Sequence, residues 1–197
     1  MNPPRRAFLA VFLFALFFGP SLRAKEKPES LLAALPTTIA DCQKKRPQNY
    51  GGKLGSSVDY DRQSLHITVY VYDLGNEAVA DGITDPVTKE AFENAKQEIQ
   101  FALKKGIYSK AKALDDGTAK YGPGQEMLKA TYKLTRTDGG VDTEYYSEIQ
   151  VYGARNYIIK LRISTTSIQD IEVAKTILRF VPELMEAIKQ LPKKDAI

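Results

Sequence analysis

The run LHITVYVY, residues Leu65–Tyr72, decides the fold class of this chain. β-branched and aromatic residues fill the run, and both types favour strands. The segment Ser56–Tyr60 before it is expected to pair with it across a turn at residues 61–63. Because successive side chains of a strand point to opposite faces, one face carries Leu65, Ile67, Val69 and Val71, and the other carries His66, Thr68, Tyr70 and Tyr72.

A helix is predicted after this pair of strands. Asp85 is a suitable N-cap, Pro86 fits the first helical position and Gly106 follows the last turn. Between these signals, apolar residues recur at helical spacing on one side, and charged or amide residues occupy the other side. The pattern predicts one amphipathic helix that lies on a sheet.

Four further strand-like runs follow, at Ile107–Leu114, Met127–Arg136, Thr143–Tyr152 and Tyr157–Thr165. The stretch DDGTAKYGPG (115–124) predicts a loop between the first two, and turn residues separate the others at hairpin spacing. Alternation within the runs predicts an antiparallel sheet with one open face. On that face we expect cross-strand charge pairs among Lys129, Lys133, Glu144, Glu148, Lys160 and Arg162.

The segments before and after these strands and this helix have their own patterns. The stretch QKKRPQNYGGKLG (43–55) predicts a solvated loop. A second helix is expected over Ile168–Leu191, and it either kinks or restarts at Pro182. Its expected apolar stripe consists of Ile171, Ala174, Leu178, Val181, Met185 and Ile188.

These elements predict a single α+β domain over residues 25–197. The domain is expected to contain an antiparallel sheet of about five to six strands with two main helices packed on it. The element order resembles the PsbP-like fold of photosystem II extrinsic subunits, which implies an α/β/α sandwich. Only the order of elements matches, so this resemblance implies no function.

Residues 1–24 are typical of an export signal. Arg5 and Arg6 precede the apolar run AFLAVFLFALFF (7–18), which is shorter than the roughly 20 residues that a membrane-spanning helix needs. Cleavage after Ala24 is expected, and a cut after Ser21 is the alternative. The arginine pair also leaves a twin-arginine signal open, and an uncleaved anchor is a further alternative.

Removal of this signal changes the charge of the protein. It takes away three arginines and no acidic residue, so the formal charge falls from +4 by three, to +1. A nucleic-acid-binding domain is expected to carry a basic surplus, so the sequence argues against nucleic acid as a partner. It predicts a periplasmic or secreted protein whose mature part has no membrane-spanning segment.

The sequence offers few reactive groups. One histidine and one cysteine do not make a usual zinc site, and no phosphate-binding loop or serine-hydrolase motif is present. A histidine-based relay would have to use His66, which we expect to be a hydrogen-bonded or surface residue. Cys42 is expected to be a buried or half-buried free thiol, with intermolecular pairing or reactivity as alternatives. No cofactor and no metal are expected.

The tyrosine content is the one positive hint in the composition. The chain has eleven tyrosines, a residue type that is enriched at protein interfaces and also common in strands. Tyr70 and Tyr72, together with Tyr146 and Tyr152, are expected to line one face of the sheet, with His66 beside the first two. Such a face would form a groove under a helix or a surface for a partner.

Three segments resemble a family of uncharacterised bacterial exported proteins. They are LPTTIADC (Leu35–Cys42), VYVYDLG (Val69–Gly75), and ADGITDP (80–86) ahead of the helix that contains Phe92. The resemblance implies an envelope location and a bacterial source. Its motifs consist of turn and strand residues, so it implies no catalytic residue.

These observations predict a non-enzymatic binding or accessory protein, with an envelope protein as the expected partner. The first alternative is carriage of a small molecule or lipid in a cavity between helix and sheet. The second is an envelope enzyme that uses carboxylate and tyrosine chemistry. No sequence pattern names the ligand, the oligomeric state or the physiological process.

Overall fold

The computed structural model describes residues 28–167 and 169–191, apart from the side chain of Asp138. These residues form an α+β structure with three α-helices, one 3₁₀ helix and nine strands. The predicted signal at residues 1–24 and the expected helix start at Ile168 lie outside the described residues. Among the residues described, no helix is both long and apolar enough to cross a membrane.

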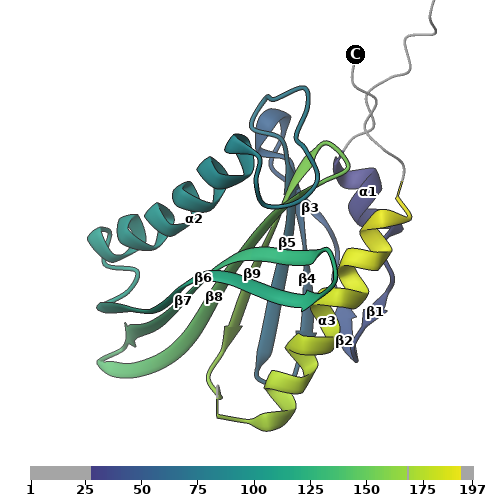
Figure 1. Cartoon of the computed structure of the whole chain (residues 1–197). Helices are drawn as coiled ribbons and strands as arrows, with labels where there is room; N and C mark the ends of the chain where they lie inside the picture. Colours follow the sequence, from purple (N-terminus) through teal and green to yellow (C-terminus); the bar gives the residue numbers. More distant parts are fainter. Residues whose placement is uncertain (1–27, 168, 192–197) are drawn as a thin grey trace, which may run out of the picture.

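The elements follow one another along the chain as drawn in Figure 1. The helices are α1 (Pro28–Ala34), η1 (3₁₀, Gly52–Leu54), α2 (Pro86–Lys104) and α3 (Ile171–Lys189). The strands are β1 (Thr38–Ile39), β2 (Cys42–Lys44), β3 (Gln48–Asn49), β4 (Ser56–Arg62), β5 (Leu65–Tyr72), β6 (Lys110–Gly122), β7 (Gln125–Asp138), β8 (Val141–Ala154) and β9 (Tyr157–Thr165).

All nine strands belong to one antiparallel sheet, in the order β1-β2-β4-β5-β9-β8-β7-β6, with β3 paired to β4. After β5 the chain leaves the sheet through α2 and returns at the far edge with β6 (Figure 1). Three hairpin turns, between β6 and β7, β7 and β8, and β8 and β9, then bring β9 back beside β5. The predicted class is confirmed, but the predicted strand number of five to six is too low.

The strongest sequence signals gave correct elements. Ser56–Arg62 pairs with Leu65–Tyr72 along its whole length, although the turn between them contains residues 63–64 instead of the predicted 61–63. The Oδ1 atom of Asp85 accepts a hydrogen bond from the backbone N–H of Val87 at 2.7 Å, so Asp85 caps α2 as predicted. The bounds of β9 equal the predicted run Tyr157–Thr165.

Two predicted loops are wrong. Strand β6 continues to Gly122, so that the turn to β7 contains only residues 123–124 instead of the predicted 115–124. A register shift between Ala113 and Asp115 absorbs the irregular sequence, because an edge strand tolerates a bulge and charged residues. The predicted loop 43–55 contains β3, η1 and most of β2, since the edge of β4 offers hydrogen bonds at both of its ends.

The predicted apolar stripe of α3 is correct only in its second half. Ile171 and Leu178 are 69% and 62% exposed, and Phe180 is fully buried instead. The spacing of apolar residues allowed two stripes, and the structure buries the one that faces Tyr60 of β4. The helix is continuous through Pro182, so the predicted alternative of a restart is wrong. The buried residues of α3 are Val173, Thr176, Phe180, Val181, Leu184, Met185 and Ile188.

Helices cover both faces of the sheet (Figure 1). We call the side under α1 and α3 the α3 face and the side under α2 the α2 face. On the α3 face, the odd-numbered residues of β5 and β9 pack against α1 and α3. On the α2 face, Tyr72 and Ile158 join residues of β7 and β8 beneath α2. The sheet therefore has an apolar core on each side.

The expected charge pairs do not share one open face. Lys133 and Glu144 form the predicted cross-strand pair, with Nζ 2.8 Å from Oε1. Lys129 instead pairs with Asp115 of β6 at 2.6 Å. Lys160 and Arg162 lie on the α2 face, because their β9 neighbours Leu161 and Ile163 point into the α3-face core.

Candidate functional site

The four predicted tyrosines lie on two faces of the sheet. Tyr70 and Tyr72 face α2, as β5 alternation predicts. Tyr146 and Tyr152 belong to the α3 face, because Tyr152 pairs with Ile159 and packs in the core under α3. The expectation of one shared face is therefore wrong. The sheet itself separates the two pairs.

Tyr152 and Tyr146 also differ in their surroundings. Tyr152 is a core residue, and its buried hydroxyl has no hydrogen-bond partner among the described residues. Tyr146 lines a pocket of about 410 Å³ between the sheet and α3. We call it the α3 pocket; its other lining residues include Lys129, Glu148, Ile163, Val173, Ile177 and Leu178.

Tyr70 and Tyr72 lie together in a pocket of about 400 Å³ beneath α2, which we call the α2 pocket. Strand β5 supplies the two tyrosines, β9 supplies Lys160, and α2 supplies one wall. The segment around η1 and the end of β5 supply the rest. The lining residues are Tyr50, Leu54, Tyr70, Tyr72, Leu74, Ala91, Asn94, Glu98 and Lys160.

Lys160 is the charged group at the floor of the α2 pocket. Its register partner on β5 is Tyr70, so the side chain lies among the tyrosines. The Nζ atom lies 4.6 Å from the ring centroid of Tyr70 and 5.8 Å from that of Tyr72. Rings at these distances attract a cation. Only 10% of the Lys160 side chain is exposed.

Glu98 of α2 neutralises this lysine from the rim of the pocket. Both carboxylate oxygens lie 3.0 Å from the Nζ atom of Lys160. The Glu98 side chain is 57% exposed, so one partner of the ion pair is buried and the other is in contact with solvent.

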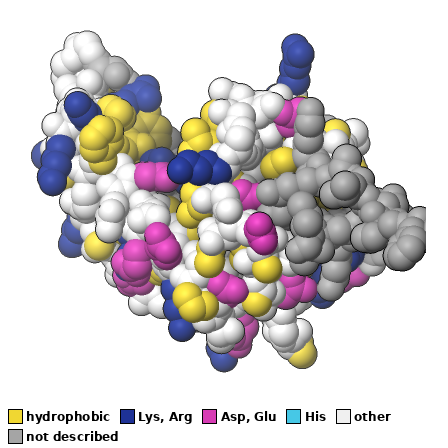
Figure 2. All heavy atoms as spheres, turned by 90° about the horizontal axis from the view of Figure 1, so that it is seen from above, with side chains coloured by type: hydrophobic (Ala, Val, Ile, Leu, Met, Phe, Trp, Pro, Cys, Tyr) yellow, Lys and Arg dark blue, Asp and Glu magenta, His cyan; other side chains and the backbone are white. Residues whose placement is uncertain are grey.

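The outer wall of the α2 pocket exposes apolar groups. Tyr50 stacks on Tyr70 with ring centroids 6.5 Å apart, and its hydroxyl lies 2.9 Å from Ser57 Oγ. Tyr50 is 42% exposed and Leu54 is 59% exposed. Figure 2 looks onto this end of the molecule and shows apolar side chains on both sides of a hollow, with charged side chains at its edge.

The phenols in the pocket are hydrogen-bond donors at neutral pH. Burial raises the pKa of Tyr72 above its usual range, and the nearby Glu98 carboxylate adds to this shift. Burial also raises the pKa of Tyr70, with Tyr50 as the next cause. Both groups therefore keep their protons.

His66 lies on the α2 face but outside the α2 pocket. Its Nδ1 atom is 2.5 Å from Asp61 Oδ1, and its Nε2 atom is 3.3 Å from Thr68 Oγ1. This is the order of a hydroxyl, imidazole and carboxylate relay. However, Asp59 Oδ1 also lies 3.6 Å from Nε2, and His66 is half exposed.

The surroundings of His66 do not support such a relay. Strand β5 is hydrogen-bonded to β4 on one side and to β9 on the other. Its backbone N–H groups are therefore used within the sheet and do not form an oxyanion hole. The arrangement acts as a hydrogen-bonded surface cluster of one histidine and two aspartates.

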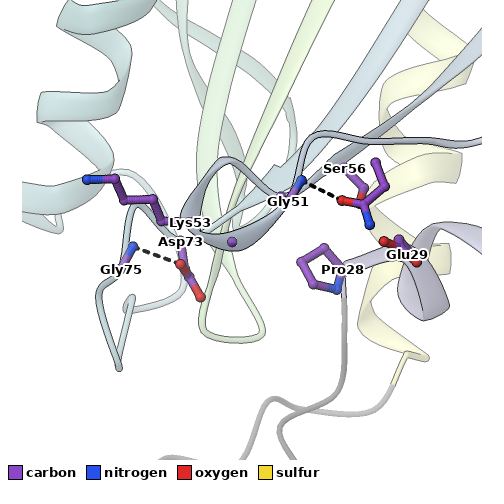
Figure 3. Close-up of a pocket in the computed structure, with 10 residues that line it drawn as sticks. Pro28, Glu29, Gly51, Lys53, Ser56, Asp73 and Gly75 are labelled. Atoms are coloured by element: carbon purple, nitrogen blue, oxygen red, sulfur yellow. Dashed lines mark hydrogen bonds between the residues drawn. The ribbon is translucent and has the colours of Figure 1, made fainter.

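A third pocket of about 490 Å³ lies beside η1 (Figure 3). Its loops are tied by short side-chain contacts, since Asp73 Oδ1 accepts from the Gly75 N–H at 2.8 Å and Asn49 Oδ1 accepts from the Gly51 N–H at 2.6 Å. Figure 3 shows the Lys53 side chain pointing away from Glu29 and Ser56. Among the described residues, its lining consists of glycine, proline and polar or charged side chains, without the tyrosine and leucine side chains of the α2 pocket.

Metal binding finds no support in the part of the chain that is described, where no three histidine, cysteine, aspartate or glutamate residues form a cluster.

No protein-family model and no curated protein matches this chain. The family expected from the three sequence segments therefore remains a prediction, and the functional argument rests on the geometry of the pockets.

Cys42 is a fully buried free thiol, and burial raises its pKa to about 11. The unfolded thiol loses its proton near pH 9, so above that pH the unfolded state is favoured. We predict that the free energy of unfolding, measured in urea, falls as the pH rises from 9 toward 11. The Cys42→Ala variant should show a smaller fall. Equal slopes for the two proteins would show that the thiol does not contribute.

Sequence reasoning predicted only Tyr70 and Tyr72 among the nine residues that line the α2 pocket and missed the other seven as site residues. Lys160 was expected on an open face, while Leu54 and Glu98 were not singled out. The signal that would have found Lys160 is its pairing with Tyr70, which requires the register between β5 and β9.

Proposed function

We propose that this chain is an exported, non-enzymatic binding protein of the cell envelope, and that its ligand enters the α2 pocket. The envelope location follows from the export signal expected at residues 1–24. The expected partner is a component of the envelope, and the aromatic side chains of β5 make the contact.

The observation that carries this proposal is Lys160. A buried charge costs stability unless it is paired, and the same position on β9 could hold an apolar residue at lower cost. Here the charge lies under exposed Tyr50 and Leu54, at the floor of an open pocket. Pockets that bind small ligands combine apolar walls with a few placed polar groups in this way.

The enzymatic alternative has less support. A catalytic acid is expected to have a raised pKa in a cleft. The carboxyl groups of Asp115 and Glu186 shift in the opposite direction, since a hydrogen bond from Lys129 lowers the pKa of Asp115 and one from Gln190 lowers that of Glu186. Both are solvated groups in surface contacts.

The α3 pocket favours carriage of a small molecule as a second candidate function. Its walls contain Ile163, Val173 and Ile177, and two further lining residues, Tyr121 and Glu148, contact the buried Gln150. The Nε2 atom of Gln150 donates to Tyr121 and Glu148, while its buried Oε1 atom has no partner among the described residues. A ligand with an apolar body suits this pocket.

Photocrosslinking in the native envelope tests the leading proposal. A benzophenone amino acid at position 54, on the rim of the α2 pocket, should give a specific adduct. The same probe at Val141, which is 66% exposed at the start of β8, is the matched control. The adduct at position 54 should disappear when Lys160→Met is added.

The same cells also test where the protein is located. The chain recovered from the periplasm or medium should begin at Lys25, as N-terminal sequencing would show. Equal labelling at positions 54 and 141, or a full-length chain confined to the cytoplasm, would contradict the proposal.

A further inference from the structure

The ion pair between Lys160 and Glu98 is uneven, and this determines which ligand the α2 pocket accepts. Lys160 belongs to the central strand β9, and its side chain is held between the rings of Tyr70 and Tyr72. Glu98 is on the outer helix and is 57% exposed. The lysine is therefore a fixed part of the site, whereas the glutamate can be replaced.

We propose that the ligand of the α2 pocket carries a carboxylate that displaces Glu98 from Lys160, and an aromatic or branched apolar group that packs on Tyr50 and Leu54. This inference rests on the proposed function, since it names the ligand class of the same site.

An exchange of carboxylates costs little. A half-exposed ion pair contributes only a small free energy, and Glu98 regains water when it leaves. The ligand carboxylate then takes the same place, so that the buried lysine stays neutralised. Charge thus gives specificity, while affinity comes from apolar contact with the exposed wall.

A cationic ligand would not fit this pocket. It would have to remove Glu98 from Lys160 and would leave two positive charges together above the tyrosine rings. A neutral ligand would keep the Glu98 pair intact and would have only the outer wall to contact. The protonated phenols of Tyr70 and Tyr72 are suited to an anion, because they offer donors and no negative charge.

The volume of the pocket limits the size of the ligand. About 400 Å³ is near the lower end of the range for small-molecule sites. It accommodates a free acid of the size of phenylpropionate, or the last residue of a peptide with its terminal carboxylate. These two sources share one chemistry, and the test separates them.

The test measures binding of four probes to the folded mature chain by calorimetry. The free acid is 3-phenylpropionate, with its amide as the neutral match. The peptide is acetyl-Ala-Phe, with its C-terminal amide as the match. We expect a dissociation constant on the order of 0.1–1 mM for at least one acid, and at least tenfold weaker binding of its amide. The acid that binds more tightly shows whether the ligand is a free acid or the C-terminal residue of a peptide.

Two substitutions act in opposite directions. Lys160→Met should weaken binding of the acid at least tenfold. Glu98→Gln should strengthen it about 3- to 10-fold, because the competing carboxylate is gone and more molecules have an open site. Neither change should alter binding of the amide. The pair Lys133→Met and Glu144→Gln, on the opposite face, is the matched control and should change nothing.

The outcomes are distinct from those of the crosslinking test. Equal binding of acid and amide, weaker binding by Glu98→Gln, or no binding of either acid to the folded protein would overturn the carboxylate inference. A specific adduct at position 54 would still support the α2 pocket as a binding site in that case. Equal labelling at positions 54 and 141 would instead contradict the proposed function itself.

Discussion

Phe180→Ala is expected to lower the free energy of unfolding by about 3–5 kcal/mol. Phe180 is fully buried on α3, and its ring meets that of Tyr60 edge to face, with centroids 5.2 Å apart. Both rings are in the core that joins α3 to the sheet, so the substitution leaves a cavity that rigid strands cannot close. Urea unfolding followed by circular dichroism measures the loss.

Leu178→Ala is the matched control. Leu178 is two positions earlier on the same helix and 62% exposed, so its truncation should change the free energy of unfolding by only about 0.5 kcal/mol. Losses of similar size at both positions would mean that α3 packs on the sheet through the stripe predicted from sequence instead of the one containing Phe180.

This comparison shows where sequence reasoning about α3 reached its limit. Ile171, Leu178 and Phe180 are all large and apolar, and helical spacing admits a stripe through either Leu178 or Phe180. Val181, Met185 and Ile188 belong to the buried side in both cases and were correctly predicted. Which stripe is buried depends on packing against Tyr60. Because Tyr60 is distant in sequence, the periodicity of α3 alone does not predict this contact.

Local signals were sufficient where the partner was close in the chain. Strands β4 and β5 are joined by a short turn, and α2 begins at a cap that its own sequence supplies. Tyr70, Tyr72 and His66 were accordingly placed on one face correctly, because alternation along a single strand settles that question.

The pairing register between two strands decides which of their residues share a face of the sheet. The turn at Arg155 and Asn156, both with positive φ, pairs Ala154 with Tyr157. Even-numbered residues of β8 therefore share a face with odd-numbered residues of β9, and Tyr146 and Tyr152 lie opposite Tyr70. The pairing of Tyr70 with Lys160 spans α2 and three strands, so no local pattern reveals the centre of the candidate site.

Gly55→Ala is expected to lower the free energy of unfolding by about 2–4 kcal/mol and to weaken ligand binding in the α2 pocket. Gly55 has a φ of +67°, and a Cβ atom there would lie 2.0 Å from the backbone oxygen of Val71 and 2.7 Å from the Tyr72 Cβ. Both contacts belong to the central strand β5, so the segment around η1 must move instead.

That movement would reach the ligand site. The Lys53 oxygen accepts a hydrogen bond from the Leu74 N–H at 3.2 Å, and Tyr50 donates its N–H to the Gly55 oxygen at 3.0 Å. A displaced Gly55 would therefore carry Tyr50 and Leu54 away from Tyr70 and open the outer wall. Calorimetry with the acid probe and urea unfolding should report both losses together.

Gly51→Ala separates strain from crowding. Gly51 also has a positive φ, +79°, but a Cβ atom there would have no neighbour within 4 Å. Its substitution should cost about 1–3 kcal/mol of backbone strain, because a φ of +79° with a ψ of 152° is a conformation that glycine alone adopts readily, and it should leave the acid probe bound as in the wild type. The two glycines flank the same 3₁₀ helix. An equal loss of acid binding in both variants would mean that the glycine backbone conformation of this segment, and not the close contact of Gly55 with β5, holds Tyr50 and Leu54 over the pocket.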